Sequence, residues 1–335
     1  MSEKLRWGII GCAAIAKRAV IPGIKNSQYG EVVAIASRDK AKAEETAQEF
    51  GIPTSYGSYE ELLADPNIDA VYIPLPNHLH KPWTIRAAEA GKHVLCEKPL
   101  ALDAREAEEM KEACAKAGVQ LAEAFMYRHH PRYHRIKEII ASGEIGEIRG
   151  IHGAFTFNNA KDYGNVRYVK EWGGGSLYDV GCYPLSAARL ILEQEPVAVT
   201  VVAQFSQQHG NVDMMASGLV EFPGDVALTF DCGMWAGGRN ILEIVGSDGS
   251  IFVPKAYLYN KQEAGDADFF VRTAQGERRE KAETLDVYAL QADDFALAVF
   301  GRQPQKFPAD DAVQNMKVLE ACLQSAEQRR TVELN

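Results

Sequence analysis

The sequence predicts an α/β protein with two domains. We expect residues 1–125 to form a doubly wound parallel sheet, and residues 126–335 to form an α+β domain with a large, mostly antiparallel open sheet. The length of 335 residues corresponds to roughly two domains. Through the first third, apolar strand-like runs alternate with helical patterns, as in a parallel sheet covered by helices. After about Phe125, short strand patterns follow one another, separated by turn residues.

The elements of the first domain follow from apolar runs and glycine stops. β-branched runs predict strands, and stripes of apolar residues ending at Gly51, Gly91 or Gly118 predict the helices between them. In the clearest helix, Asp103 is placed to cap the first turn and Glu106 stands at the reciprocal capping position. The predicted strands span residues 5–11, 31–38, 69–76, 92–99 and 119–125, and the helices 13–24, 39–50, 79–90 and 103–117.

The elements of the second domain are mainly strands joined by short turns. A helix is expected at residues 130–141, and another carries Asp179 and Tyr183 after a run of glycines. "FPGD" and "GSDGS" are typical of hairpin turns, so most strands should pair antiparallel. We predict strands at 147–157, 196–205, 214–222, 225–234, 240–247 and 249–254, and closing helices at 287–300 and 309–328 that pack back across the structure.

Composition excludes several classes of protein. The net charge of −10 argues against a nucleic-acid partner, because such proteins carry basic patches. No run of 18 apolar residues is present to span a membrane, and the sequence "MSEKLRWGII" has no signal-like segment. The six cysteines form no C-x-x-C pair, so we interpret them as core residues in a reducing compartment. We therefore expect a cytoplasmic protein.

The first strand–helix loop, "GCAAIA", is a partial dinucleotide fingerprint. Gly11 keeps the tight turn, whereas Ala13 and Ala16 replace the second and third glycines. An ordinary strand–helix turn is the alternative explanation. If the loop is part of a Rossmann domain, the cofactor should lie at the carboxyl ends of the strands, in the loops after Gly11, Ser37, Ile73 and Cys96. In the first of these loops we expect cofactor contacts from Gly11, Cys12, Ala13 and Ile15.

The second loop, "ASRDKAK", favours NADP(H) over NAD(H). Ser37 stands where an acidic residue usually holds a free ribose hydroxyl, and Arg38, with Lys42 nearby, is suited to a 2′-phosphate. Alternatively, Arg38 and Lys42 are solvated charges at a helix start. Asp39 lies close enough to keep NAD(H) possible.

Five motifs in order resemble the Gfo/Idh/MocA family of oxidoreductases. They are "WGIIGCAAIA", "YIPLPNHLH", "GKHVLCEKPL", "EAFMYRHHP" and "GGGSLYDVGCYPL", and the resemblance covers nearly the whole chain. Within the family, the motif sequences most resemble those of the branch of aldose dehydrogenases, dimeric dihydrodiol dehydrogenases and glucose-fructose oxidoreductase. The resemblance implies a Rossmann domain followed by a substrate domain. It also implies dimers formed through the open face of the second sheet.

The resemblance also implies the reacting groups. Glu97, Lys98 and Pro99 should lie beside the nicotinamide, with a cis bond before Pro99, and Asp179 and Tyr183 should face Lys98 across a domain cleft. The commoner family form has histidine in place of Tyr183. We expect Tyr183 to be the acid/base, with its pKa lowered by Lys98⁺ and coupled to it. Asp179 would orient a substrate hydroxyl or Lys98. The alternatives are a packed core tyrosine for Tyr183 and a solvated lysine for Lys98.

Other motif residues give weaker signals. We expect contacts with the cofactor from Leu75, Pro76, Asn77 and His80, although His80 is equally plausible as a helix-start residue. Arg167 and Trp172 are expected at the nicotinamide end, or else as surface loop anchors. Tyr127 is expected to line the substrate pocket. His130 and His134 have a spacing that permits zinc, but no carboxylate or thiolate nearby completes a ligand set, so no metal is expected.

These observations lead to one preferred function and two alternatives. The preferred function is an NADP(H)-dependent oxidoreductase that moves hydride between nicotinamide and a sugar or polyol carbon, with an aldose or a trans-dihydrodiol as substrate. One alternative is an NAD(H)-dependent cyclitol or keto-sugar dehydrogenase. The other is a non-catalytic, NADP(H)-sensing regulatory protein. We expect a homodimer or homotetramer, formed through the open face of the second sheet.

Overall fold

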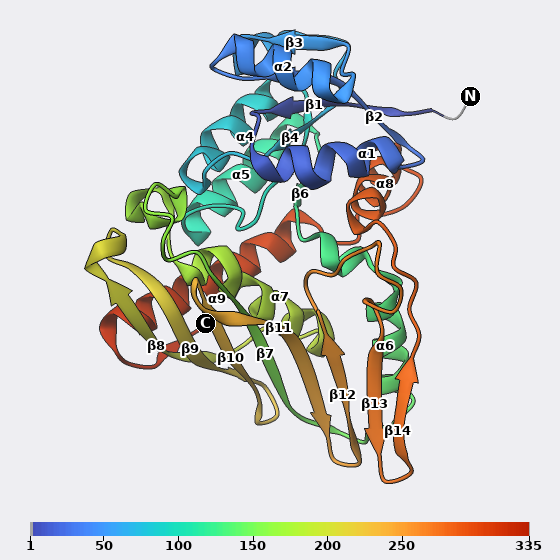
Figure 1. Ribbon diagram of the computed structural model, residues 1–335, viewed down its shortest axis with the longest axis vertical. Coiled ribbons are helices and arrows are strands. Elements are labelled where there is room, and N and C mark those ends of the chain that lie inside the picture. Colours follow the sequence, from blue (N-terminus) through green and yellow to red (C-terminus); the bar gives the residue numbers. More distant parts are fainter. Residues whose placement is uncertain (1–2, 335) are drawn as a thin grey trace. The chain divides into compact units, whose positions relative to one another are not determined.

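The computed structural model describes residues 3–334 and divides into two compact units (Figure 1). Residues up to 129 and 286–316 form the first unit, and residues 130–285 and 317 onwards form the second. The segment 286–316 therefore groups with the first unit, although it lies late in the sequence. The division also falls inside the last helix, α9 (Ala309–Gln328).

A six-stranded parallel sheet with the order β3-β2-β1-β4-β5-β6 forms the centre of the first unit. This order reverses between β1 and β4, as in a doubly wound dinucleotide-binding sheet, so the predicted fold class is confirmed. β3 and the helix that follows it, α3, were not predicted. The strands are β1 (Leu5–Ile10), β2 (Gly30–Ala36), β3 (Thr54–Tyr56), β4 (Ala70–Ile73), β5 (His93–Cys96) and β6 (Leu121–Glu123).

Helices cover the sheet and close its core. Gly23 in α1 lies against α8, where a Cβ would come 2.5 Å from the Cβ of Tyr288, so the two helices pack closely. Asp103 caps α5 as predicted, but the carboxylate of Glu106 accepts from the N–H of Leu102 instead of Asp103. The helices are α1 (Ile21–Asn26), preceded by a π-turn η1 (Ala16–Val20), α2 (Lys40–Phe50), α3 (Tyr59–Ala64), α4 (His80–Glu89), α5 (Ala104–Ala117) and α8 (Val287–Val299).

A nine-stranded sheet with the order β14-β13-β12-β11-β7-β10-β9-β8-β15 forms the second unit. All neighbouring pairs are antiparallel except β7 with β10, which are parallel. The expected large, mostly antiparallel sheet is confirmed, and β13 to β15 extend it beyond the predicted strands. The strands are β7 (Ile148–Asn158), β8 (Ala198–Ser206), β9 (Val212–Phe222), β10 (Val226–Gly233), β11 (Trp235–Gly246), β12 (Gly249–Pro254), β13 (Phe269–Thr273), β14 (Gly276–Glu280) and β15 (Val332–Glu333).

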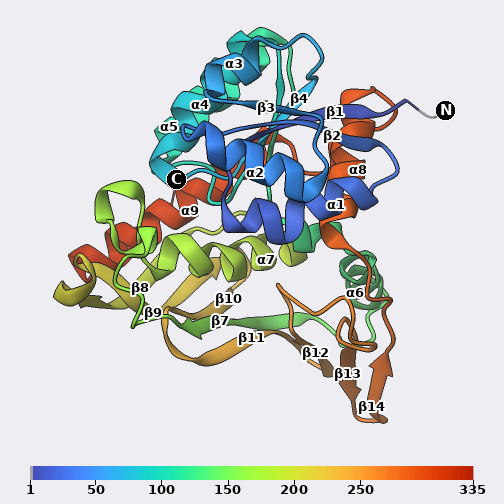
Figure 2. The same ribbon diagram turned by 45° about the horizontal axis from the view of Figure 1, so that its top comes forward.

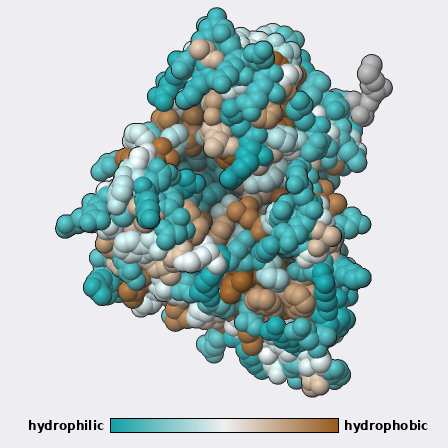
Figure 3. Space-filling model, viewed as in Figure 1, coloured by the Kyte–Doolittle hydropathy of each residue, from teal (hydrophilic) through white to brown (hydrophobic). Residues whose placement is uncertain are grey.

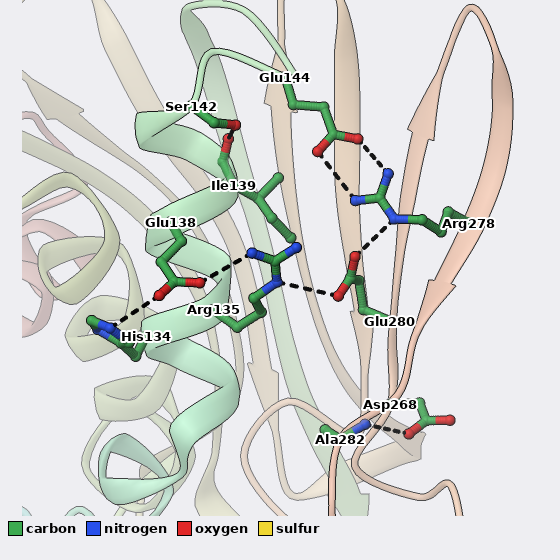
Figure 4. A network of polar contacts seen from close by, with 10 residues as sticks. All are labelled: His134, Arg135, Glu138, Ile139, Ser142, Glu144, Asp268, Arg278, Glu280 and Ala282. Atoms are coloured by element: carbon green, nitrogen blue, oxygen red, sulfur yellow. Dashed lines mark hydrogen bonds and ion pairs between the residues drawn. The ribbon is translucent and has the colours of Figure 1, made fainter.

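Helices of this unit lie on one face of the sheet, among them α6 (Pro131–Ala141) and α7 (Cys182–Leu192) (Figure 2). At the sheet edge, Arg135 of α6 and Arg278 of β14 share the carboxylate of Glu280 (Figure 4). Arg278 also pairs with Glu144, in the loop after α6. This ion-pair network ties the edge hairpin β13–β14 to the helix layer and places charges along an edge strand, which discourages further strand pairing.

The other face of the nine-stranded sheet is open. Strand alternation and register place Val202 and Leu219 on this face, and these residues are 61% and 38% exposed. Elsewhere the surface seen in Figure 3 is mostly hydrophilic, with apolar residues interspersed. Within residues 3–334, no helix combines the length and apolar character needed to cross a bilayer.

Candidate functional site

One group of candidate site residues lies at the carboxyl end of β1 in the first unit. Gly11 has φ +106° and its N–H donates to the carbonyl of Ala36 at the end of β2. A Cβ at Gly11 would lie 3.0 Å from Leu75, which follows β4, so only glycine brings the two loops this close. Ala13 accepts from Lys17 in the following helix, and Cys12 and Ile15 pack against the core. The loop therefore presents backbone groups and a helix N-terminus at the point where the strand order reverses.

The turn after β2 places a cation at the edge of this loop. The carboxylate of Asp39 caps α2 by accepting from the N–H of Lys42, and the hydroxyl of Ser37 accepts from the N–H of Asp39. Asp39 is thus engaged in the helix cap. Arg38 is exposed and interacts with the hydroxyl of Tyr59. Burial raises the pKa of Tyr59, and the nearby positive charge of Arg38 opposes that rise.

Tyr59 links this turn to the glycine loop. Its hydroxyl lies 3.6 Å from the Cβ position of Gly11, and its ring is only 6% exposed and packs edge-on against Trp83 at 4.8 Å. Tyr59 therefore lies close both to Arg38 and to the loop that follows β1.

His80 is buried and tied to two loops. Its ring nitrogens lie 2.7 Å from the carbonyl oxygen of Leu75 and 3.0 Å from that of Pro99. Burial lowers the pKa of His80 to about 4, so the ring is neutral and donates to only one of these carbonyls. His80 therefore fixes the loops after β4 and β5. Pro76 and Asn77, at the start of the turn η2 (Asn77–Leu79), are only partly buried.

Lys98 lies in a loop anchored at three points. The Lys98–Pro99 bond is cis, as the resemblance implied. The hydroxyl of Tyr72 donates to the carboxylate of Glu97 at 2.6 Å, and His80 contacts the carbonyl of Pro99. The buried carboxylate of Glu123 accepts from the N–H of Leu100 at 2.9 Å. Lys98 itself is only partly buried, so a fixed backbone carries a side chain with access to a ligand.

Another group of candidate site residues is built on the helix that continues into α7 in the second unit. Arg167 Nε donates to the carboxylate of Asp179 at 2.7 Å. The negative charge of Asp179 is the main cause of the raised pKa of Arg167, and Tyr183 contributes further. The structure thus brings Arg167, Asp179 and Tyr183 together. Arg167 had been expected at the nicotinamide end, and its pairing with Asp179 was not predicted.

Asp179 lies in a π-turn, η6 (Leu177–Gly181), which runs directly into α7. Such turns are rare and often occur at functional sites. At Gly181 a Cβ would lie 3.0 Å from the sulfur of Cys232, so the glycine lets the helix approach β10. The prediction that a helix carries Asp179 and Tyr183 is confirmed, with a wider first turn than expected.

Tyr183 lies in an aromatic cluster. Its ring is 5.1 Å from that of Phe155 and 5.5 Å from that of Tyr257, and the residue is 5% exposed. Packing on two sides fixes the ring, which fits a packed core tyrosine as well as a positioned acid/base, so the acid/base role stays a prediction.

The remaining predicted residues differ in their surroundings. Tyr127 is fully buried beside Phe125, so its contact with a substrate stays a prediction. Trp172 is 39% exposed at the end of the short turn η5 (Lys170–Trp172). The side chain of His130 caps α6, and His134 pairs with Glu138 on the surface. Within residues 3–334, no group of three or more His, Cys, Asp or Glu side chains is arranged to hold a metal ion.

Several anchoring residues were not predicted. Tyr59, Tyr72 and Glu123 reach the cofactor-side loops from other elements. Glu123 ends β6, so the rule that ligands bind at the carboxyl ends of strands would have found it if applied to this strand as well. No local pattern marks Tyr59 or Tyr72.

Comparison with known proteins places this architecture in a family. Residues 5–125 match the model of an oxidoreductase family with an NAD-binding Rossmann fold, and residues 133–252 match the C-terminal domain model of the same family. An uncharacterized oxidoreductase of Rhizobium meliloti is 43% identical over 97% of this chain and 98% of its own length. An NADP(+)-dependent D-xylose 1-dehydrogenase of Haloferax volcanii is 38% identical over 99% of this chain and all of its own length.

Solved structures of oxidoreductases match this chain over nearly its whole length. An aldose-aldose oxidoreductase from Caulobacter crescentus, in complex with glycerol, matches with a TM-score of 0.91 and 27% identity, over 99% of this chain and all of that one. A 3-ketoreductase from Actinomadura kijaniata, in complex with NADP and TDP-benzene, matches with a TM-score of 0.91 and 31% identity, over 96% of this chain and 98% of that one. The chain therefore belongs to the Gfo/Idh/MocA family of oxidoreductases.

Proposed function

We propose that this protein is an NADP(H)-dependent oxidoreductase that transfers hydride between nicotinamide and a carbon of a sugar or polyol. An aldose is the first choice of substrate, and a trans-dihydrodiol the second. The observation that carries the proposal is the fixed group in the second unit, in which Arg167 holds the Asp179 carboxylate on the same helix as Tyr183. The NADP(+)-dependent xylose dehydrogenase supports both the cofactor and the substrate class.

The residues of the first unit fit a phosphorylated dinucleotide. The loop after β1 offers backbone N–H groups and a helix N-terminus for the pyrophosphate, and Gly11 leaves no side chain in the way. Asp39 is engaged in capping α2, so the turn after β2 presents Arg38, with Lys42 nearby, and no unengaged carboxylate of its own. That combination favours a 2′-phosphate over a free ribose hydroxyl. We propose further cofactor contacts from Cys12, Ala13, Ile15, Ser37, Leu75, Pro76, Asn77, Glu97 and Trp172.

When bound, the nicotinamide supplies or accepts the hydride. The protein then has to manage a proton on the substrate oxygen. We propose that Tyr183 gives or takes this proton and that Lys98 assists by hydrogen-bonding the same oxygen and stabilising negative charge on it. Asp179, held by Arg167, orients a substrate hydroxyl.

The proposal extends to the organisation of the chain. We propose that residues 1–125 bind the dinucleotide and that residues 126–335 bind the substrate and mediate self-association through the open sheet face. Val202 and Leu219 supply exposed apolar surface there. We propose a cytoplasmic location, since none of the six cysteines forms a disulfide within the described part of the chain.

The test is the absorbance of reduced nicotinamide over time, with NADP⁺ or NAD⁺ and a panel of aldoses, cyclitols and a dihydrodiol. We expect NADP⁺ reduction with an aldose. Lys98→Met and Tyr183→Phe should each lower kcat by about 100-fold or more, because each removes a group that assists proton transfer. The double variant should lose little more than either single variant, because residues that act as one unit are not additive.

The matched control is Lys40→Met, which removes an exposed lysine that pairs with Glu44 on the surface of α2. It should leave kcat unchanged. Full turnover by Lys98→Met and Tyr183→Phe would show that the proposed acid/base assignment is wrong, and turnover with NAD⁺ alone would contradict the choice of cofactor.

A further inference from the structure

A buried carboxylate from the sheet holds the start of the helix that carries Asp179. Asp213 lies on β9 and is 2% exposed. Its Oδ2 accepts from the hydroxyl of Ser176 at 2.7 Å and from the N–H of Leu177 at 2.8 Å. The residue at the N-cap position, Ser176, makes no side-chain cap of its own, so Asp213 caps this helix from a distant strand.

The glycines before the helix make this contact possible. Gly175 has φ +121°, and a Cβ there would lie 2.0 Å from Oδ1 of Asp213. A Cβ at Gly174 would lie 2.5 Å from the carbonyl oxygen of Arg167. Any side chain at either position would push the segment away from the carboxylate or from the Arg167 backbone.

The held segment connects directly to the acid/base group. Gly175 donates its N–H to the carbonyl of Arg167 at 3.0 Å, and its own carbonyl accepts from the N–H of Asp179 at 3.1 Å. The side chains of Arg167 and Asp179 then pair at 2.7 Å. Asp213 therefore fixes, through one peptide segment, the backbones of both partners of that ion pair.

We propose that Asp213 is a positioning residue, whose ionised carboxylate holds the Gly175–Leu177 segment and thereby sets the geometry of Arg167, Asp179 and Tyr183. This inference rests on the proposed function of those residues. Protonation of Asp213 would weaken both of its charge-assisted hydrogen bonds and loosen the segment. Activity should therefore fall as the pH drops through the pKa of this group.

The surroundings of Asp213 set that pH range. Burial raises its pKa to about 6, and the hydrogen bonds from Ser176 and Leu177 limit the rise. The groups that face it are the Ser176 hydroxyl, the Leu177 N–H and the Cys232 thiol on β10, whose own pKa burial raises well above its usual value. Arg167 and Asp179, whose backbones bond to the held segment, pair with each other.

The effect of Asp213 ionisation on the stability of the fold distinguishes a positioning residue from one that only stabilises the fold. The folded-state pKa of Asp213 lies above its ordinary value, so its stabilising effect is present below about pH 4 and is lost as the pH rises through 6. The ionised carboxylate thus costs stability at the pH where it holds the helix. A residue serving stability alone would not carry this charge, whereas a positioning residue requires it.

The experiment compares Asp213→Asn with the wild type from pH 5 to 8. In the wild type, kcat should fall roughly tenfold between pH 7 and pH 5, since about a tenth of the carboxylate stays ionised. Asp213→Asn should lower kcat at pH 7 about tenfold, because misplacement of a reacting group slows the reaction. It should also lose the fall of kcat between pH 7 and pH 5, which we call the acid limb of the pH profile. Its KM for the dinucleotide and its thermal midpoint at pH 7 should not worsen.

A second variant keeps the carboxylate. Ser176→Ala removes one hydrogen bond to the charged form, so the acid limb should move to higher pH while activity at pH 8 is retained. The matched control is Asp231→Asn on the neighbouring strand β10. This aspartate also accepts from a serine, Ser217, but it pairs with Arg239 and makes no contact with the helix. It should leave the pH profile unchanged.

Hydrogen exchange at residues 175–181, followed by mass spectrometry, gives a readout independent of catalysis. Exchange there should be faster in Asp213→Asn, and in the wild type below pH 6 after correction for the intrinsic rate. An unchanged acid limb in both variants, or unchanged exchange, would overturn the proposal, as would a fall in stability of Asp213→Asn in proportion to kcat. If Lys98→Met and Tyr183→Phe are fully active, the proposed function fails, and the exchange measurement alone decides the role of Asp213.

Discussion

At the scale of single residues, the choice between NADP(H) and NAD(H) depends on Arg38. Ser37 carries no charge, and Asp39 is engaged at the N-terminus of α2. Arg38 is exposed and lies near the hydroxyl of Tyr59. Hydrogen bonds to charged groups contribute about 1.5–3 kcal/mol. Arg38→Ala should therefore raise KM for NADP⁺ by roughly 10-fold to 100-fold and leave KM for NAD⁺ unchanged.

The control for this change is Lys40→Ala, two residues further along. Lys40 is exposed, and its ammonium lies 3.9 Å from the carboxylate of Glu44 one turn away, a weak surface pair. It should leave both KM values unchanged. Equal changes in the two KM values of Arg38→Ala would mean that Arg38 contacts a part that the two cofactors share.

A residue could be predicted from the sequence when the pattern that marks it is contiguous in the chain. Gly11, Lys98, Asp179 and Tyr183 stand in contiguous motifs, so a pattern identifies them. Asp213 was not predicted, because its effect depends on the packing of β9 against a helix start that lies 36 residues earlier at Leu177. Tyr59 and Glu123 were missed for the same reason, since their partners are distant in the sequence.

At the scale of elements, segments with a clear apolar run or helical period were predictable, even the three-residue β6, whereas β3, α3 and β13 to β15 were not predicted. The alternation of strands and helices gave the parallel sheet, and the hairpin turns gave the antiparallel one. β3 has three residues and a half-buried pattern, so it carries no clear period. β14 reads "GERRE" and is mostly exposed, so its pairing comes from β13 and from the ion pairs to α6.

The open face of the nine-stranded sheet leads to a prediction about assembly. Charged side chains on this face pair with one another: Arg239 forms an ion pair with Asp231 and also a hydrogen bond with His152. Satisfied charges next to exposed Val202 and Leu219 can be buried by a second copy at low cost. Leu219→Lys should therefore shift the protein to monomers in sedimentation velocity, because it places an unpaired charge in that contact.

Leu258→Lys is the matched control. Leu258 is 40% exposed, close to the 38% of Leu219, but it lies in the loop after β12, outside the strands. It should sediment like the wild type. If the wild type is itself a monomer at micromolar concentration, or if Leu219→Lys assembles normally, this face does not mediate self-association.

At the scale of the whole molecule, each unit contains a buried histidine that opposes protonation. Burial lowers the pKa of His80, in the first unit, and of His130, in the second, to about 4. Neutral His130 satisfies both of its neighbours, since Nδ1 accepts from the N–H of Arg132 while Nε2 donates to the carbonyl of Glu283. Protonation would remove the acceptor that caps α6. In both units, therefore, the folded state favours the neutral ring.

This arrangement predicts how stability depends on pH. The folded-state pKa of each histidine lies below the unfolded value of 6.5, so its stabilising effect is complete above pH 6.5 and is lost as the pH falls toward 4. Between pH 7 and pH 5 each histidine should cost about 2 kcal/mol of unfolding free energy. Asp213 opposes this trend, because its raised pKa of about 6 adds stability over the same range, by about 1 kcal/mol. The net loss from these three groups should be about 3 kcal/mol.

Thermal and urea unfolding at pH 7 and pH 5 tests this balance, and variants separate its parts. His80→Gln and His130→Gln cannot titrate, so each should reduce the difference between the two pH values, whatever its effect on stability at pH 7. Asp213→Asn should increase that difference, because the opposing group is gone. His134→Gln, on an exposed side chain of α6, is the control and should change nothing. A protein equally stable at both pH values, or histidine variants that keep the full difference, would show that these rings are protonated in the folded state and that their carbonyl contacts outweigh burial.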